Sequence, residues 1–146
     1  MNLLAYALVA VVSYLGLVAG YILSIVAKEE MKPGRKYFIA AQKILVIVIF
    51  LSLIVLGKGY IPILLTIVFI LLARKDLSSP IMYIFFAFVL YLSKSLPLFA
   101  VESSLILLYG LPTGALIAKK EMKENMMNLS KYLVFIAALI LLFFLK

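Results

Sequence analysis

The chain has 146 residues, a formal net charge of +8, and a composition that is 67% hydrophobic. It contains no polar stretch long enough to enclose a soluble core, so we expect one domain, residues 1–146, that is apolar almost throughout. The lack of Cys and His excludes disulfides, thiol catalysis and histidine-based metal sites. We therefore expect no enzyme activity, no cofactor and no metal centre, and anionic lipid headgroups rather than nucleic acid as the partner of the positive charge.

Short charged clusters recur along the chain and divide it into apolar segments. About 20 apolar residues in a helix cross the ~30 Å hydrocarbon core of a bilayer. Breaks at positions such as Gly57, Pro80 and Pro97 separate the segments. The predicted fold class is therefore all-α, a polytopic transmembrane helical bundle of six spans: 2–27, 37–57, 59–73, 80–96, 97–118 and 129–145.

The basic residues are distributed unequally between the two sides of this bundle. The loops after the first, third and fifth spans, with nearby Lys43, carry eleven of the fourteen Lys and Arg residues. The positive-inside rule then predicts a multi-pass protein of the cell membrane with cytoplasmic basic loops and both termini outside. A rival topology makes 59–73 and 80–96 a re-entrant hairpin. It would bury the three charges at 74–76, at a cost of about 8–10 kcal/mol, so six spans are preferred.

Three cytoplasmic turns share an order of residue types, namely Ala, basic, charged, acidic, then Met or Leu. They begin at Ala27, Ala73 and Ala118, at intervals of 46 and 45 residues, and each precedes a helix that opens on a Tyr. This pattern indicates three repeated two-helix hairpins, 1–57, 59–96 and 97–146, around a pseudo-threefold axis. The alternative is that any six-span protein with short loops has a period near this length.

The first span has two distinct faces, one small or hydroxyl-bearing and one branched. We expect the first to meet protein and the second to meet lipid, because lipid gives no hydrophobic reason to hide branched side chains. The hydroxyl-bearing face includes Tyr6, Ala10, Ser13, Gly20, Tyr21 and Ser24, and the branched face includes Leu4, Leu8, Val11, Leu15, Ile22 and Val26. Two GxxxG spacings, Gly16 with Gly20 and Gly110 with Gly114, predict close helix packing.

The candidate binding residues are the few polar groups inside the spans. Glu102 is the one carboxylate in a predicted span, and Tyr109 and Thr113 follow on the same helix face, so it is a candidate cation or proton site. The alternative is an interfacial pair with Lys94. Lys43 is either a snorkelling anchor or part of a substrate pathway. Pro112 predicts a bend in the same span that exposes carbonyl groups.

These features favour a transporter or channel-like bundle for an ion or a small or amphiphilic molecule. The alternative is a non-catalytic membrane scaffold or a subunit of a larger complex, in which the GxxxG faces bind a second copy or another membrane protein. The two differ in one respect that can be measured, since only the first moves a solute.

Overall fold

The computed structural model describes residues 3–56, 63–64, 66–67, 77–93, 95–118 and 122–144. Within these ranges the chain is helical and contains no strand. The helices are α1 (Leu3–Val26), α2 (Met31–Leu56), α4 (Pro80–Leu92), α5 (Leu96–Ile117), α6 (Met122–Lys131) and α7 (Val134–Phe144). The predicted all-α class is confirmed.

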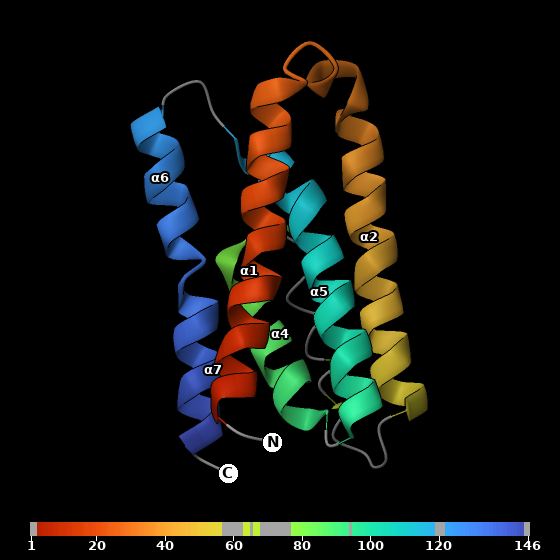
Figure 1. Ribbon diagram of the computed structural model, residues 1–146. Helices are drawn as coiled ribbons and strands as arrows, with labels where there is room; N and C mark the ends of the chain where they lie inside the picture. Colours follow the sequence, from red (N-terminus) through yellow and green to blue (C-terminus); the bar gives the residue numbers. More distant parts are fainter. Residues whose placement is uncertain are drawn as a thin grey trace.

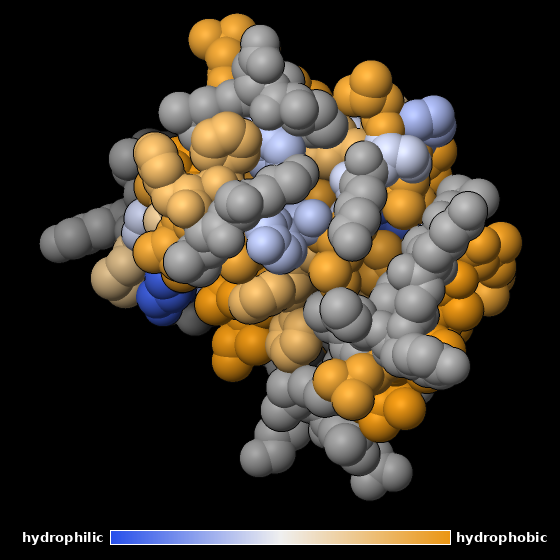
Figure 2. Space-filling model, turned by 90° about the horizontal axis from the view of Figure 1, so that it is seen from below, coloured by the Kyte–Doolittle hydropathy of each residue, from blue (hydrophilic) through white to orange (hydrophobic). Residues whose placement is uncertain are grey.

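Four helical segments are long and apolar enough to cross a membrane: Tyr6–Val26, Pro33–Val55, Leu96–Ile117 and Met127–Phe144. The last comprises the end of α6, a turn at Tyr132 and Leu133, and α7. Large apolar side chains remain exposed along these segments, for example Val26 at 79%, Val55 at 70% and Phe144 at 73%. Seen from the end where the termini lie, orange apolar side chains reach the perimeter on several sides (Figure 2). Such exposure suits lipid, not water, and indicates a membrane protein.

Helix α5 lies at the centre of the bundle, packed against α1 and α2 and, over a shorter length, against α4 (Figure 1). Helix α7 packs against α4 and α1. The contacts show that α1 runs parallel to α5, because Gly16 meets Leu107 and Gly20 meets Leu111. By contrast α2 is antiparallel to α5. The N- and C-termini lie at the same end of the molecule in Figure 1.

The contact between α1 and α5 has glycine on both sides. A Cβ atom on Gly16 would overlap the carbonyl oxygen of Leu107, and one on Gly20 would overlap that of Leu111. In return, a Cβ on Gly110 would lie 2.7 Å from the carbonyl carbon of Gly16, and one on Gly114 would lie 2.7 Å from the amide nitrogen of Tyr21. The backbones therefore touch, so both GxxxG spacings are occupied by this one intramolecular contact.

The two faces of α1 lie as expected. Tyr6, Ala10, Ser13, Gly20 and Ser24 are buried and Tyr21 is partly buried, whereas the predicted lipid-facing residues expose between 46% and 79% of their surface. Tyr6 packs on Phe99 of α5 and Phe143 of α7, with ring centroids 4.9 and 5.4 Å apart. The prediction from side-chain size and polarity is confirmed.

The structure does not establish six crossings. The predicted span 59–73 falls largely outside the described residues. The predicted span 80–96 begins at the expected place, with Ser79 as N-cap and Pro80 in the first turn, but α4 ends at Leu92 after 13 residues. A helix of that length extends about 20 Å, less than the hydrocarbon core.

The repeat prediction also remains open. Much of the middle hairpin, 59–96, lies outside the described residues, including the Ala73 turn. The outer hairpins differ in form, since α1 and α2 each run without interruption whereas the last span is broken by the turn at Tyr132. The pseudo-threefold repeat therefore stays a prediction.

Candidate functional site

Glu102 is completely buried, with 0% of its surface exposed, in the first half of α5. It lies about 9 Å along the helix axis from Leu96, at 1.5 Å per residue. Its Oε1 accepts a hydrogen bond of 2.8 Å from the Ser52 hydroxyl of α2. Its Oε2 is buried and has no hydrogen-bond partner in the part of the chain that the structure describes. A carboxyl group in this position needs a proton or a cation to balance its charge.

The Ser52 hydroxyl lies between two acceptors. Its oxygen is 2.9 Å from the Ile49 carbonyl oxygen, one turn earlier in α2, and 2.8 Å from Glu102 Oε1. A hydroxyl has one proton to donate and can also accept. Ser52 can therefore donate to an ionised Glu102, or accept from a protonated Glu102 while donating to Ile49. One geometry accommodates both protonation states of the carboxyl group.

Neither lysine of the predicted site is shown near Glu102. Lys43 is exposed on α2, which places it on the outside of the described bundle, in keeping with the anchoring role. Lys94 lies outside the described residues, so the proposed pair of Lys94 with Glu102 cannot be assessed. Among the described residues, the hydrogen-bonding neighbour of Glu102 is the uncharged hydroxyl group of Ser52.

Thr113 faces α2 as Glu102 does, but near the opposite end of α5. It is fully buried, accepts a 2.7 Å hydrogen bond from Gln42 Nε2, and donates a 2.8 Å bond to the Tyr109 carbonyl. Eleven residues of helix place it about 16 Å from Glu102, so the two do not share a ligand site. Pro112 lies inside α5, which continues through it to Ile117.

Tyr109 points toward α4 rather than α2. Its hydroxyl donates to the backbone carbonyl of Leu77, in the turn before α4, and its ring packs on Phe86 with centroids 4.8 Å apart. Tyr132 makes the equivalent bond to the Ser78 carbonyl, and its ring stands edge-on to that of Tyr83 at 5.1 Å. Tyr109 of α5 and Tyr132 of the turn between α6 and α7 therefore hold the turn at 77–79 against the bundle.

Sequence reasoning did not single out Ser52, Tyr83 or Tyr132 as site residues. Serine and tyrosine are common in apolar helices, and the position of Tyr83 and Tyr132 after the repeated turns indicated a repeat and not a site. One signal was available for Ser52: it lies ten residues beyond Gln42, as Glu102 lies eleven residues before Thr113. This matched spacing becomes informative only when α2 and α5 are known to be antiparallel neighbours.

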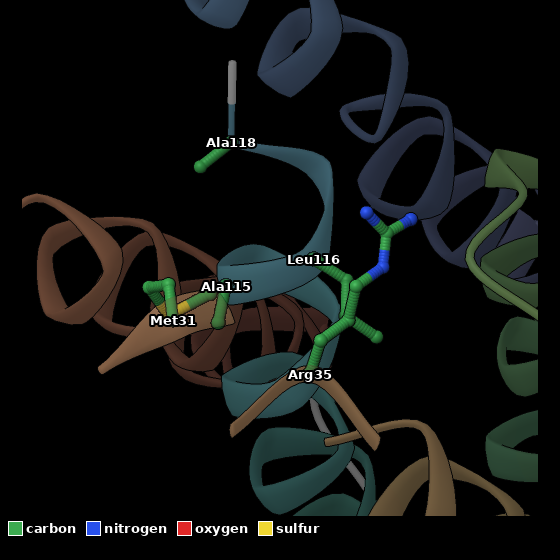
Figure 3. Close-up of a pocket in the computed structure, with 5 residues that line it drawn as sticks. All are labelled: Met31, Arg35, Ala115, Leu116 and Ala118. Atoms are coloured by element: carbon green, nitrogen blue, oxygen red, sulfur yellow. The ribbon is translucent and has the colours of Figure 1, made fainter. Parts of the chain in front are cut away.

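A separate pocket lies at the other end of the bundle, between the start of α2 and the end of α5. Met31 and Arg35 line it from α2, and Ala115, Leu116 and Ala118 line it from the end of α5 (Figure 3). The Arg35 side chain extends past Leu116 and its guanidinium group reaches away from α2 in this view. This is the end that carries the α1–α2 turn in Figure 1.

No protein family model, curated protein or solved structure matches this chain.

Proposed function

We propose that this protein is a small multi-pass transporter or channel-like bundle in which Glu102 binds and releases an ion. The observation that carries the proposal is the fully buried carboxyl group with one oxygen bonded to Ser52 and the other without a partner among the described residues. Burying an ionisable group in a spanning helix costs about 2.5–3.5 kcal/mol on insertion scales. That cost is a reason to expect a function for it.

The proton is the ion that best suits this site. No group of three acidic or imidazole side chains converges anywhere in the described chain. Hard metal cations prefer several oxygen ligands, whereas a proton needs one carboxylate oxygen and a neighbour that can both donate and accept. Ser52 is such a neighbour. A solute moved together with the proton would be small or amphiphilic, because few polar side chains line the interior.

The six-span topology with both termini outside is part of the proposal. It is supported by the distribution of basic residues and by the position of the two termini at one end of the molecule. Four crossings with a re-entrant segment between α2 and α5 would also leave the termini on one side. The short α4 is the observation in favour of this second arrangement, whereas the cost of burying the three charges at 74–76 favours six crossings.

The scaffold alternative loses one of its supports. It relied on GxxxG faces that were free to bind another helix, but the four glycines contact one another's helices across α1 and α5. A partner helix would have to bind elsewhere. The proposed role is non-catalytic under either alternative.

Proton flux into vesicles tests the proposal. The protein is reconstituted in liposomes that contain a pH-sensitive dye, and a potassium diffusion potential drives proton entry. We expect flux with the wild-type protein, its abolition by Glu102→Gln, and a reduction of several fold by Ser52→Ala. Glu29→Gln is the matched control, since it neutralises an exposed carboxyl group on the α1–α2 turn and should change nothing.

Two results would reject the transport proposal. One is wild-type flux no greater than that of empty liposomes across a range of imposed potentials and pH gradients. The other is wild-type flux that survives Glu102→Gln undiminished. The first result would leave the scaffold alternative standing, and the second would move the ion path away from Glu102.

A further inference from the structure

The pocket between α2 and α5 combines one strongly basic group with an apolar lining. Arg35 contributes the guanidinium group, and Met31, Ala115, Leu116 and Ala118 contribute only apolar side chains. The two alanines keep the lining short at the end of α5, which leaves room that larger residues would fill. A ligand that fits this pocket has an anionic group beside an apolar portion.

The charge of Arg35 is not neutralised within the described chain. Arg35 is exposed and forms no ion pair with any described residue. Residues 28–36 contain four basic and two acidic side chains, so this end of the bundle is positive overall. Lys36, the next residue, has its ammonium nitrogen 5.1 Å from the centre of the Tyr37 ring and does not line the pocket.

The pocket lies at the ends of two membrane-length segments, where we expect the membrane surface. Arg35 lies near the first of the residues that form the second membrane-length segment, Pro33–Val55, and Ala118 directly follows the end of the third, Leu96–Ile117. Beyond the pocket, α2 presents exposed apolar side chains such as Tyr37 and Ile39, at 68% and 38%. A headgroup at Arg35 would therefore have its acyl chains against the lipid-facing surface of α2.

We propose that this pocket binds the phosphate group of an anionic phospholipid, with Arg35 as the principal contact. A planar guanidinium group forms two parallel hydrogen bonds to phosphate oxygens, a geometry that an ammonium group cannot supply. Basic pockets between transmembrane helices on the cytoplasmic side suit such headgroups. The expected orientation of the protein places this end of the bundle in the cytoplasmic leaflet. The proposal concerns a site separate from Glu102 and does not depend on transport.

Native mass spectrometry of the detergent-solubilised full chain tests it, with phosphatidylglycerol and phosphatidylcholine of equal chain length as probes. We expect one phosphatidylglycerol molecule to bind more tightly than any phosphatidylcholine. Arg35→Gln should weaken that binding about tenfold, the loss expected for one charge-assisted contact. Ala118→Leu, which fills the pocket without changing charge, should weaken it as well. Lys36→Gln is the matched control and should retain the lipid.

Four outcomes would overturn the proposal. Equal binding by wild type and Arg35→Gln would exclude Arg35, and unchanged binding by Ala118→Leu would exclude the pocket. An equal loss with Lys36→Gln would indicate diffuse attraction to positive charge. Inorganic phosphate is added in a separate arm, and its displacement of the lipid at equal concentration would assign the pocket to a free anion instead. Circular dichroism of each variant establishes that the helices are intact.

Discussion

At the scale of single residues, polar groups inside this bundle are placed opposite one another. Gln42 and Thr113 form a fully buried side-chain hydrogen bond. The Thr113 hydroxyl group also donates a hydrogen bond to a backbone carbonyl of α5. Glu102 and Ser52 form a second side-chain hydrogen bond between the same two helices, which is partly buried. Glu102 differs because one of its oxygens has no described partner, which is why the functional proposal rests on Glu102 and not on Thr113.

The Gln42–Thr113 bond is expected to contribute modestly to stability. Gln42→Leu and Thr113→Val should each lower the free energy of unfolding by about 1 kcal/mol, because each removes the buried hydrogen bond between the two side chains. The double variant should lose less than the sum by about 0.6 kcal/mol, the usual size of such a bond in a membrane protein. Unfolding in a denaturing detergent can be followed by far-UV circular dichroism, since the chain has no Trp for fluorescence.

Ser104→Ala serves as the control for this pair. Ser104 is exposed on α5, and its hydroxyl bonds only to the Ala100 carbonyl of its own helix. Its loss should leave stability within about 0.5 kcal/mol of the wild type. Strict additivity in the double variant would show that the two side chains are not coupled.

At the scale of elements, the parallel pair α1 and α5 is the closest helix contact described. Backbone atoms of the two helices approach each other at the glycines, so the helices gain dispersion contacts along the crossing. Helix α5 contacts α4 differently, through the Phe86 ring that packs on Tyr109 and through the Tyr109 hydroxyl group, which bonds the turn before α4. Helix α5 therefore makes a different kind of contact with each of these two neighbours.

Substitution of the crossing glycines should destabilise the bundle. Gly20→Ala places a methyl group against the Leu111 backbone, so the two helices must move apart to make room for it. We expect the free energy of unfolding to fall by about 1–3 kcal/mol. Gly34→Ala makes the same chemical change in α2, where the nearest neighbour of the new atom is the Phe38 ring at 3.4 Å. It should be neutral or stabilise the protein by up to ~1 kcal/mol, because alanine favours a helix. Thermal unfolding of the two variants measures this contrast, and equal stability would refute the close contact.

At the scale of the whole molecule, the direction of each helix constrains the topology. Parallel α1 and α5, with antiparallel α2 between them in the chain, return the chain to its starting side before α5 begins. The segment between α2 and α5 then either crosses twice or enters and leaves on one side. Both arrangements keep the two termini together, as Figure 1 shows.

The orientation can be tested in the naturally Cys-free chain. Asn2→Cys should react with a membrane-impermeant maleimide added outside intact cells, whereas Pro33→Cys should react only after the membrane is opened. The reason is the excess of Lys and Arg beside Pro33, which retains that loop in the cytoplasm. Modification of both cysteines from the same side would contradict the topology, and the unsubstituted chain reports background labelling.

The sequence alone determined that the chain is a helical membrane protein, where its four membrane-length segments lie, and which face of α1 is buried in the bundle. Membrane-length segments and helix faces are determined by the hydropathy and size of side chains within one or two turns of each other. These properties can therefore be read from the order of residues along the chain. The start of α4 was also determined by local sequence, because Ser79 is its N-cap and Pro80 lies in its first turn. The end of α4 was missed by four residues, since Ser93 and the cap of α5 at Ser95 end the helix before the apolar run does.

Only the tertiary structure decided which polar groups meet. Glu102 was expected either to pair with Lys94, which lies outside the described residues, or to form a site with Tyr109 and Thr113. The structure gives these last three separate partners, since Glu102 bonds Ser52, Thr113 bonds Gln42 and Tyr109 bonds the turn before α4. These partners lie between 32 and 71 residues apart in the chain. Whether such groups meet depends on which helices are neighbours, in which direction they run and how each is rotated about its axis. The sequence of one helix does not specify any of these three.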